Sequence, residues 1–219
     1  MADIFDEIEE DLRRDRMKLL WQRYGNYIIG LAVLIIIVVA GNQGYDYWKK
    51  SESQAAGDAF FEAVGADESL DALTTLVPDL PVGYEMLARF RIAALQAEDG
   101  DNFTAEQSFL ALSEDNSIDI FYREVALLLS VMNAPSSVDK NILIGRLSSL
   151  SAFPGSLQGL ALETSAGLYL ELNERDKAIS TLTEASKLPD IPSSLRQRIS
   201  QSLSIISEKY TDNRSVISE

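Results

Sequence analysis

Cysteine and histidine are both absent from the 219 residues of this chain. Their absence excludes disulfide bonds, cysteine nucleophiles, zinc sites built from thiolate or imidazole ligands, and every mechanism that uses imidazole as an acid or a base. A glycine-rich phosphate loop and the Gly-x-Ser-x-Gly turn of serine hydrolases are missing as well. We therefore predict no catalytic residue, no cofactor and no metal site, and we do not expect an enzyme.

Positive charge is scarce: 19 Lys and Arg residues stand against 34 Asp and Glu residues, which gives a formal net charge of −15 at pH 7. The basic residues in the second half form no stripe or cluster, whereas nucleic-acid binding needs a positive face. We expect neither nucleic acid nor a small-molecule substrate as a partner. The hydrophobic content of 46% is typical of a folded protein.

One long stretch of the chain lacks charge altogether. Residues 24–45 contain no charged side chain, and 28–40 contain only Ile, Leu, Val, Ala and one Gly. A helix of this length rises roughly 33 Å, enough to cross a hydrocarbon core of about 30 Å. We predict a transmembrane helix over 24–45. Aromatic residues that suit the headgroup level flank it on both sides: Trp21, Tyr24, Tyr27, Tyr45, Tyr47 and Trp48.

A cleaved signal peptide and a buried core helix are the alternatives to this anchor. Val38 and Ala40 are small residues that could precede a cleavage site. However, the preceding segment is long and holds seven acidic residues, the apolar run exceeds the usual signal-peptide length, and the second aromatic group would have no role after cleavage. A core helix seldom runs this far without a charge. We favour an uncleaved anchor.

The charges beside the run predict its orientation. Only Lys49 and Lys50 follow it closely, whereas five basic residues precede it: Arg13, Arg14, Arg16, Lys18 and Arg23. Since basic residues stay on the cytoplasmic side, we expect a cytoplasmic N-terminus and a C-terminal domain outside, which in a bacterium is the periplasm. The expected location is the bacterial inner membrane, with a single span. The 27 acidic and 14 basic residues from Asp46 onward should keep that domain off anionic lipid.

Residues 1–23 are predicted to form a cytoplasmic amphipathic tail. A narrow apolar stripe recurs there at helical spacing, formed by Ile4, Phe5, Ile8 and Leu12. A helix with this stripe either lies against the headgroups or docks on a partner, and we favour the first reading.

The remainder of the chain shows apolar residues at three- and four-residue spacing and no alternating strand pattern. We predict an all-α domain with short breakers of Pro, Gly and Asn between helical hairpins. The predicted helices are 53–64, 68–77, 83–99, 103–114, 119–132, 138–150, 156–172, 174–188 and 193–210. Residues 46–82 are expected to be a helical connector, and 83–219 the periplasmic domain.

Small and bulky residues alternate in this domain in the pattern of a tetratricopeptide repeat. The clearest copy consists of Leu162, Ala166, Tyr169, Asn173, Ala178, Leu182, Ala185 and Pro189. Its alanines allow close helix approach, and Asn173 suits a left-handed turn between the helices. An earlier copy contains Ile92, Ala93, Gly100, Ala105 and Phe109, and a degenerate middle copy contains Ala126 and Leu129. We predict an α-solenoid of about three tetratricopeptide-like hairpins with a C-terminal capping helix; an unrelated helical bundle is the alternative.

Several motifs along the chain resemble the YfgM-like tetratricopeptide-repeat family, in its alphaproteobacterial type. They are Asp11 to Arg16, Leu20 to Tyr27, Gly44 to Trp48, Ala55 to Asp58, Gly83-Tyr84, Leu87 to Arg89, Ala93 to Leu95 and Leu195 to Arg198. The segment Asn133 to Ser137 departs from the pattern, because it replaces a clean hairpin. The resemblance implies an ancillary subunit of the SecYEG translocon that assists newly exported proteins together with a PpiD-like periplasmic chaperone.

Two other functions remain open from the residues themselves. One is a bitopic envelope-stress signalling regulator that acts through its cytoplasmic tail; the other is a catalytic cell-envelope protein, which would need an acid in a cleft. For the interaction scaffold that we favour, candidate residues of a binding face are Tyr84, Arg89, Tyr122, Arg123 and Tyr169.

Overall fold

The structure, a computed structural model, describes residues 34, 36–45, 47–152 and 154–216. Within these residues the elements are α-helices and one short 3-10 helix, with no strand. The prediction of an all-α protein is therefore confirmed. The chain divides after Gly57 into two compact units, 1–57 and 58–219, and each is described by itself.

In the first unit, residues 36–45 and 47–57 are helical. Half of the predicted span lies outside the described residues, namely 24–33 and 35. The tail, the basic residues before the span, Trp21, Tyr24 and Tyr27 lie outside them as well. No helix in the described part of the chain is long and apolar enough to cross a membrane. The aromatic residues after the run are exposed, and the ring centroids of Tyr45 and Trp48 lie 6.4 Å apart.

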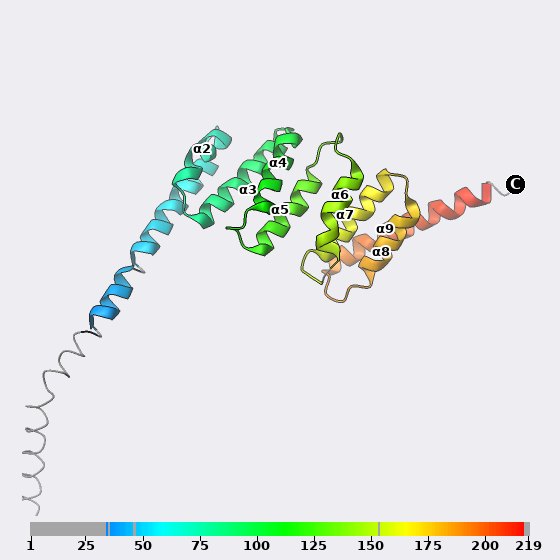
Figure 1. Cartoon of the computed structure of the whole chain (residues 1–219). Helices are drawn as coiled ribbons and strands as arrows, with labels where there is room; N and C mark the ends of the chain where they lie inside the picture. Colours follow the sequence, from blue (N-terminus) through cyan, green and yellow to red (C-terminus); the bar gives the residue numbers. More distant parts are fainter. Residues whose placement is uncertain (1–33, 35, 46, 153, 217–219) are drawn as a thin grey trace, which may run out of the picture. The chain divides into compact units, whose positions relative to one another are not determined.

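The second unit begins with residues 58–64, which are helical, and continues through a series of antiparallel helices in sequence order (Figure 1). Its elements are α2 (Ser69–Leu76), η1 (Val77–Asp79), α3 (Val82–Glu98), α4 (Asn102–Glu114), α5 (Ile120–Met132), α6 (Lys140–Ser151), α7 (Gln158–Glu171), α8 (Arg175–Ser186) and α9 (Ser193–Val216). From α2 to α9 each α-helix packs against the next one, and α7 also contacts α9. The helices predicted from residue 68 onward agree with these bounds within a few residues, except that α9 extends six residues beyond its predicted end. The helix predicted at 53–64 starts earlier, since residues 47–64 are helical.

Local polar groups explain where the helices begin and turn. Asp101, Asp119 and Asp139 each precede a helix and accept a hydrogen bond from a backbone N–H of its first turn, which is the usual role of an N-cap carboxylate. Two turns use left-handed backbone, with φ values of 84° at Gly100 and 61° at Asn173. Asparagine tolerates this conformation better than other residues with a side chain, so the α7–α8 turn has the geometry expected from its sequence.

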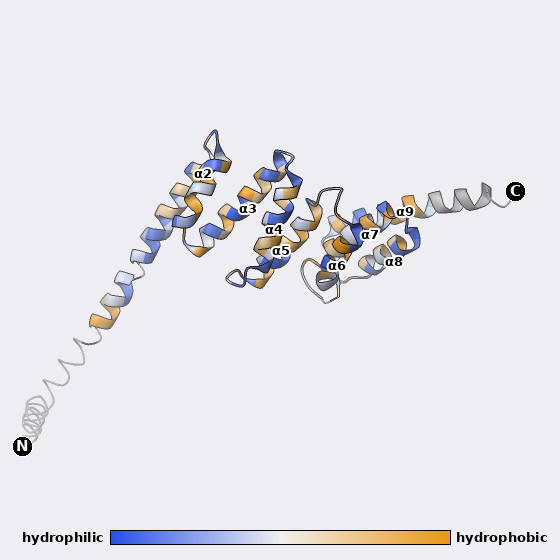
Figure 2. Cartoon of the chain, turned by 45° about the horizontal axis from the view of Figure 1, so that its top comes forward, coloured by the Kyte–Doolittle hydropathy of each residue, from blue (hydrophilic) through white to orange (hydrophobic). Residues whose placement is uncertain are grey.

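The core of the second unit is a chain of apolar clusters, each shared by consecutive helices. One joins α3, α4 and α5 around Phe109; the next joins α5, α6 and α7 around Leu147; the third joins α7, α8 and α9 around Leu182. Figure 2 shows that each helix carries both hydrophobic and hydrophilic residues, as expected for elements that bury one face. Nearest-neighbour burial of this kind is the organisation of a helical solenoid.

The second unit also contains the segment 58–82, which the sequence analysis assigns to a connector. Leu73 of α2 is fully buried, and α2 packs against α3. The compact unit therefore starts 25 residues before the predicted domain boundary at residue 83.

Truncation of Leu147 should measure how strongly the middle cluster stabilises the unit. Leu147 is completely buried, so Leu147→Ala should lower the free energy of unfolding by about 2–5 kcal/mol through lost burial and a residual cavity. Ile142 lies on the same helix but is 55% exposed, so Ile142→Ala should change the free energy of unfolding by no more than about 0.5 kcal/mol. Chemical denaturation followed by circular dichroism checks both; equal losses would contradict the assignment of this cluster to the core.

Candidate protein-interaction groove

Most residues predicted to pack the repeats lie in the core. Eight of them are at most 2% exposed: Ala93, Ala105, Phe109, Ala126, Ala166, Ala178, Leu182 and Ala185. Tyr169 is partly buried against the α7–α9 cluster, whereas Gly100 and Asn173 are exposed at the turns described above. These residues form the core and the turns of the unit, so a binding surface must consist of other residues.

An apolar groove lies between α3, α4 and α5, with a volume of about 410 Å³. We call it the α3/α5 groove. Its walls are Phe90, Ala94 and Ala97 of α3 and Leu129 of α5, and the buried ring of Phe109 forms part of the lining from α4. The rings of Phe90 and Phe109 are 6.2 Å apart in a tilted arrangement. Concave apolar sites with few polar groups are typical of binding pockets.

The polar residues at the edge of the α3/α5 groove already have partners. Glu98 forms an ion pair with Arg91, with a distance of 2.9 Å between Oε1 and Nη1. The side-chain amide of Asn133 donates to the carbonyl of Leu129 at 2.8 Å. The groove therefore offers an apolar surface and little unpaired charge, which suits an uncharged apolar segment better than a charged ligand.

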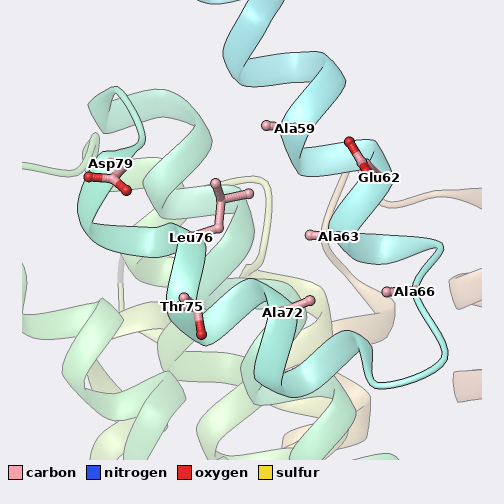
Figure 3. Close-up of a pocket in the computed structure, with 8 residues that line it drawn as sticks. All are labelled: Ala59, Glu62, Ala63, Ala66, Ala72, Thr75, Leu76 and Asp79. Carbon is pink, nitrogen blue, oxygen red and sulfur yellow. The ribbon is translucent and has the colours of Figure 1, made fainter.

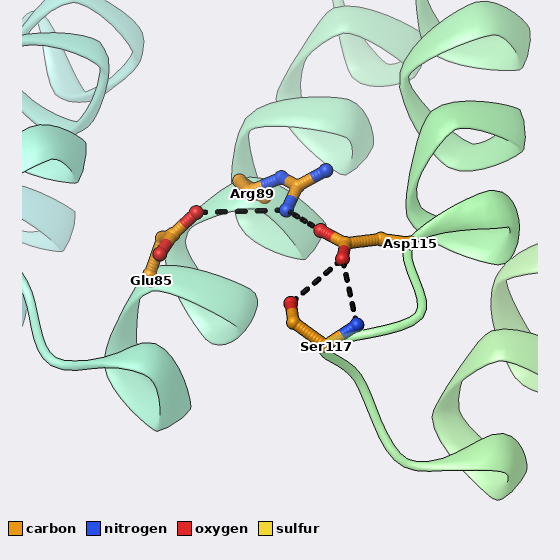
Figure 4. Close-up of polar contacts among 4 residues, drawn as sticks. All are labelled: Glu85, Arg89, Asp115 and Ser117. Atoms are coloured by element: carbon orange, nitrogen blue, oxygen red, sulfur yellow. Dashed lines mark hydrogen bonds and ion pairs between the residues drawn. The ribbon is translucent and has the colours of Figure 1, made fainter.

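A polar cluster fixes the α4–α5 loop to α3 (Figure 4). Arg89 contacts the carboxylate of Asp115 at 2.5 Å and that of Glu85 at 3.5 Å. Asp115 also accepts hydrogen bonds from the hydroxyl and the backbone N–H of Ser117, at 2.6 and 3.0 Å. The Ser117 hydroxyl and then the Arg89 guanidinium hold the pKa of Asp115 well below its usual range, because both stabilise the ionised carboxylate.

Two further ion pairs join helices that are not consecutive. Glu106 of α4 is nearly buried and contacts Arg146 of α6 at 2.5 Å. Arg198 of α9 donates to both carboxylate oxygens of Glu163 on α7, at 3.0 and 2.6 Å. Sequence reasoning did not find these pairs, because their members are 40 and 35 residues apart and carry no local signal.

The residues proposed from the sequence for a binding face lie mostly in such structural contacts. Arg89 is part of the loop cluster, and Arg123 donates to the side-chain oxygen of Asn116 at 2.7 Å. The ring of Tyr84 lies 6.0 Å from that of Phe60, and the ammonium of Lys177 lies 5.5 Å above the ring of Tyr169. Of the five, only Tyr122 is exposed, at 43%, and its ring lies beside that of Phe121. None of the five lines the α3/α5 groove.

Comparison with protein families identifies this architecture. A family described as "Tetratricopeptide repeat-like domain" matches residues 18–187, which is more than half of the chain. The chain belongs to this family. The matched part of the tetratricopeptide repeat-like chain runs from before the apolar run to the end of α8, and all of α9 lies beyond it. No curated protein and no solved structure matches the chain.

Removal of the Asp115 carboxylate should destabilise the unit in a pH-dependent way. The pKa of Asp115 is lowered in the folded state, so its contribution is fully present above the unfolded pKa of about 3.9 and is lost as the pH falls below it. Asp115→Ala should therefore unfold at a lower urea concentration than the wild type at pH 7. The difference between the two urea midpoints should become smaller below about pH 4. Glu114→Ala, at the exposed neighbouring position, is the control. A gap that stays constant from pH 7 to pH 3 would contradict this account.

Proposed function

We propose that this tetratricopeptide repeat-like protein is a non-enzymatic scaffold whose α3/α5 groove holds an apolar segment of a protein partner. The observation that carries the proposal is the groove itself: about 410 Å³ lined by two phenylalanines, two alanines and a leucine, with its edge charges already paired. The family supports an interaction role, since stacked helical repeats form extended binding surfaces. Among the described residues, no group of three or more acidic side chains could hold a metal ion.

We further propose that residues 24–45 anchor this scaffold in the bacterial inner membrane. The uncharged run, the aromatic residues on both sides and the basic residues before it support a single span with a cytoplasmic N-terminus. The family match starts at residue 18 and so includes the run together with the repeats. This favours an uncleaved membrane anchor over a cleaved signal peptide. The repeat unit is then periplasmic.

The partners that we propose are the SecYEG translocon and a PpiD-like periplasmic chaperone, so that the scaffold assists newly exported proteins. This step is supported by the resemblance of the boundary motifs, above all Leu20 to Tyr27, to the YfgM-like family. A membrane-tethered helical repeat beside a translocon would present its apolar groove to chains that have just crossed the membrane.

A bulky side chain in the α3/α5 groove should reduce the recovery of these partners. Ala97 is a partly exposed lining residue, so Ala97→Trp should fill the groove without disturbing the core beneath it. Ala111→Trp, at an exposed position of α4 outside the groove, is the matched control. Full-length protein purified in mild detergent and analysed by quantitative mass spectrometry should lose translocon and chaperone peptides at least fivefold in Ala97→Trp alone. A cytoplasmic regulator recovered without the translocon would support the signalling alternative instead.

The absence of cysteine allows the proposed orientation to be measured directly. A single cysteine at Ser51 should react with a membrane-impermeant maleimide in intact spheroplasts, because it follows the span on the periplasmic side. A single cysteine at Ala2 should react only after permeabilisation. The cysteine-free wild type gives the background. The reverse pattern would contradict the orientation, and recovery of the protein in the soluble fraction would contradict the anchor.

A further inference from the structure

A second groove lies at the start of the repeat unit, between the helical residues 58–64 and α2 (Figure 3). We call it the first-hairpin groove; its volume is about 400 Å³. Methyl groups of Ala59, Ala63 and Ala66 line one side, and Ala72 and Leu76 lie across from them. None of its lining residues lines the α3/α5 groove, so the two sites are distinct.

Alanine walls of this kind are covered by another helix elsewhere in the unit. Ala178 and Ala185 of α8 are completely buried in a cluster that Leu195 and Ile199 of α9 complete. In the first-hairpin groove, by contrast, Ala66 and Thr75 are exposed and Ala59 and Ala72 are only partly buried. Small side chains let helices approach closely. The shape and lining therefore suit one more helix, supplied from outside this part of the chain.

The charge around the first-hairpin groove is entirely negative. Residues 58–88 of this unit contain no Lys or Arg and seven acidic residues: Asp58, Glu62, Asp67, Glu68, Asp71, Asp79 and Glu85. Glu62 and Asp79 line the groove, are exposed, and take part in no ion pair among the described residues. The first cation that follows, Arg89, is held by Asp115 and Glu85. A ligand of this groove must bring its own positive charge.

We propose that the first-hairpin groove docks a cationic amphipathic helix of a partner protein. The small apolar face of that helix packs on the alanines, and Lys or Arg residues beside this face pair with Glu62 and Asp79. Anionic lipid and nucleic acid are repelled by the same carboxylates. The inference goes beyond the scaffold function proposed above, since it concerns a separate surface and a partner segment of the opposite character: charged and helical instead of uncharged and apolar.

A designed helix tests this directly on the full-length protein in phosphatidylcholine nanodiscs, with empty nanodiscs as the blank. The probe is a fluorescent 18-residue peptide of Ala, Leu and Lys with lysines on both flanks of an Ala/Leu stripe; its matched partner carries Glu in place of every Lys. Fluorescence anisotropy should show saturable binding of the lysine peptide only. Thr75→Trp, which fills the groove from an exposed position, and the double variant Glu62→Lys with Asp79→Lys should each weaken binding at least tenfold.

The matched control reverses two exposed charges outside the groove, Asp99→Lys with Glu184→Lys, and so changes the net charge by the same amount. It should change the affinity less than twofold. An equal loss of affinity in this control would mean that the lysine peptide is attracted only by the net charge of the protein, and would overturn the proposal. Unchanged binding of the lysine peptide by Thr75→Trp would overturn it too, as would equal binding of the glutamate peptide by the wild type. Absence of saturable binding to the wild type would overturn it as well.

Two further measurements keep the test decisive. Circular dichroism melting shows whether Thr75→Trp is folded; Ala66→Trp, at another exposed lining position, replaces it if it is not. Sedimentation velocity of the wild type and Thr75→Trp shows whether a second copy fills the groove, and self-association that Thr75→Trp abolishes would overturn the proposal in favour of a homodimer. Because Ala97→Trp leaves the first-hairpin groove intact, failure of the scaffold proposal and failure of this one are distinguishable.

Discussion

Close approach of helix backbones is the constraint on which the repeat unit depends. Alanines with 0–1% exposure recur in the packing of the unit: Ala93, Ala105, Ala126, Ala166, Ala178 and Ala185. Helix axes pack about 8–10 Å apart, and the side chains at the contact decide where in that range a pair lies. A larger residue at such a site would force neighbouring side chains from their preferred rotamers, at about 1–3 kcal/mol. Phe109, Leu147 and Leu182 then fill the space that the alanines leave beside them.

Ion pairs help to set how the helices are positioned along one another, which apolar packing alone does not specify. The pair between Glu106 and Arg146 links α4 to α6, and the two bonds between Arg198 and Glu163 link α7 to α9. Arg89 connects α3 to the loop that follows α4 through Asp115. An exposed ion pair contributes little to stability, but paired guanidinium and carboxylate groups have a preferred geometry. Arg89, Arg146 and Arg198 are thus held by carboxylates within the unit.

The helices were predictable because their signals are local. Gly100 and Asn173 mark turns by their backbone preferences, and Asp101, Asp119 and Asp139 mark helix starts by the hydrogen bonds they accept. The grooves were not predictable in this way: Phe90, Phe109 and Leu129 meet from three helices, and only the tertiary structure brings them together. Arg89 and Arg123, candidates for a binding face from the sequence, contact Asp115 and Asn116 of the α4–α5 loop, and no local sequence pattern predicts these contacts. The burial of Leu73 against neighbouring helices likewise shows why the unit starts before the predicted boundary.

The uneven distribution of charge gives the two grooves different selectivity. Beside the α3/α5 groove Glu98 is neutralised by Arg91, so an apolar segment can enter without leaving a carboxylate unpaired. Beside the first-hairpin groove the carboxylates of Glu62 and Asp79 have no cation within the described residues, and an uncharged helix that covered them would remove part of their hydration without compensation. Each groove therefore discriminates against the ligand of the other. They share no lining residue, so a segment bound in one groove does not occupy the other.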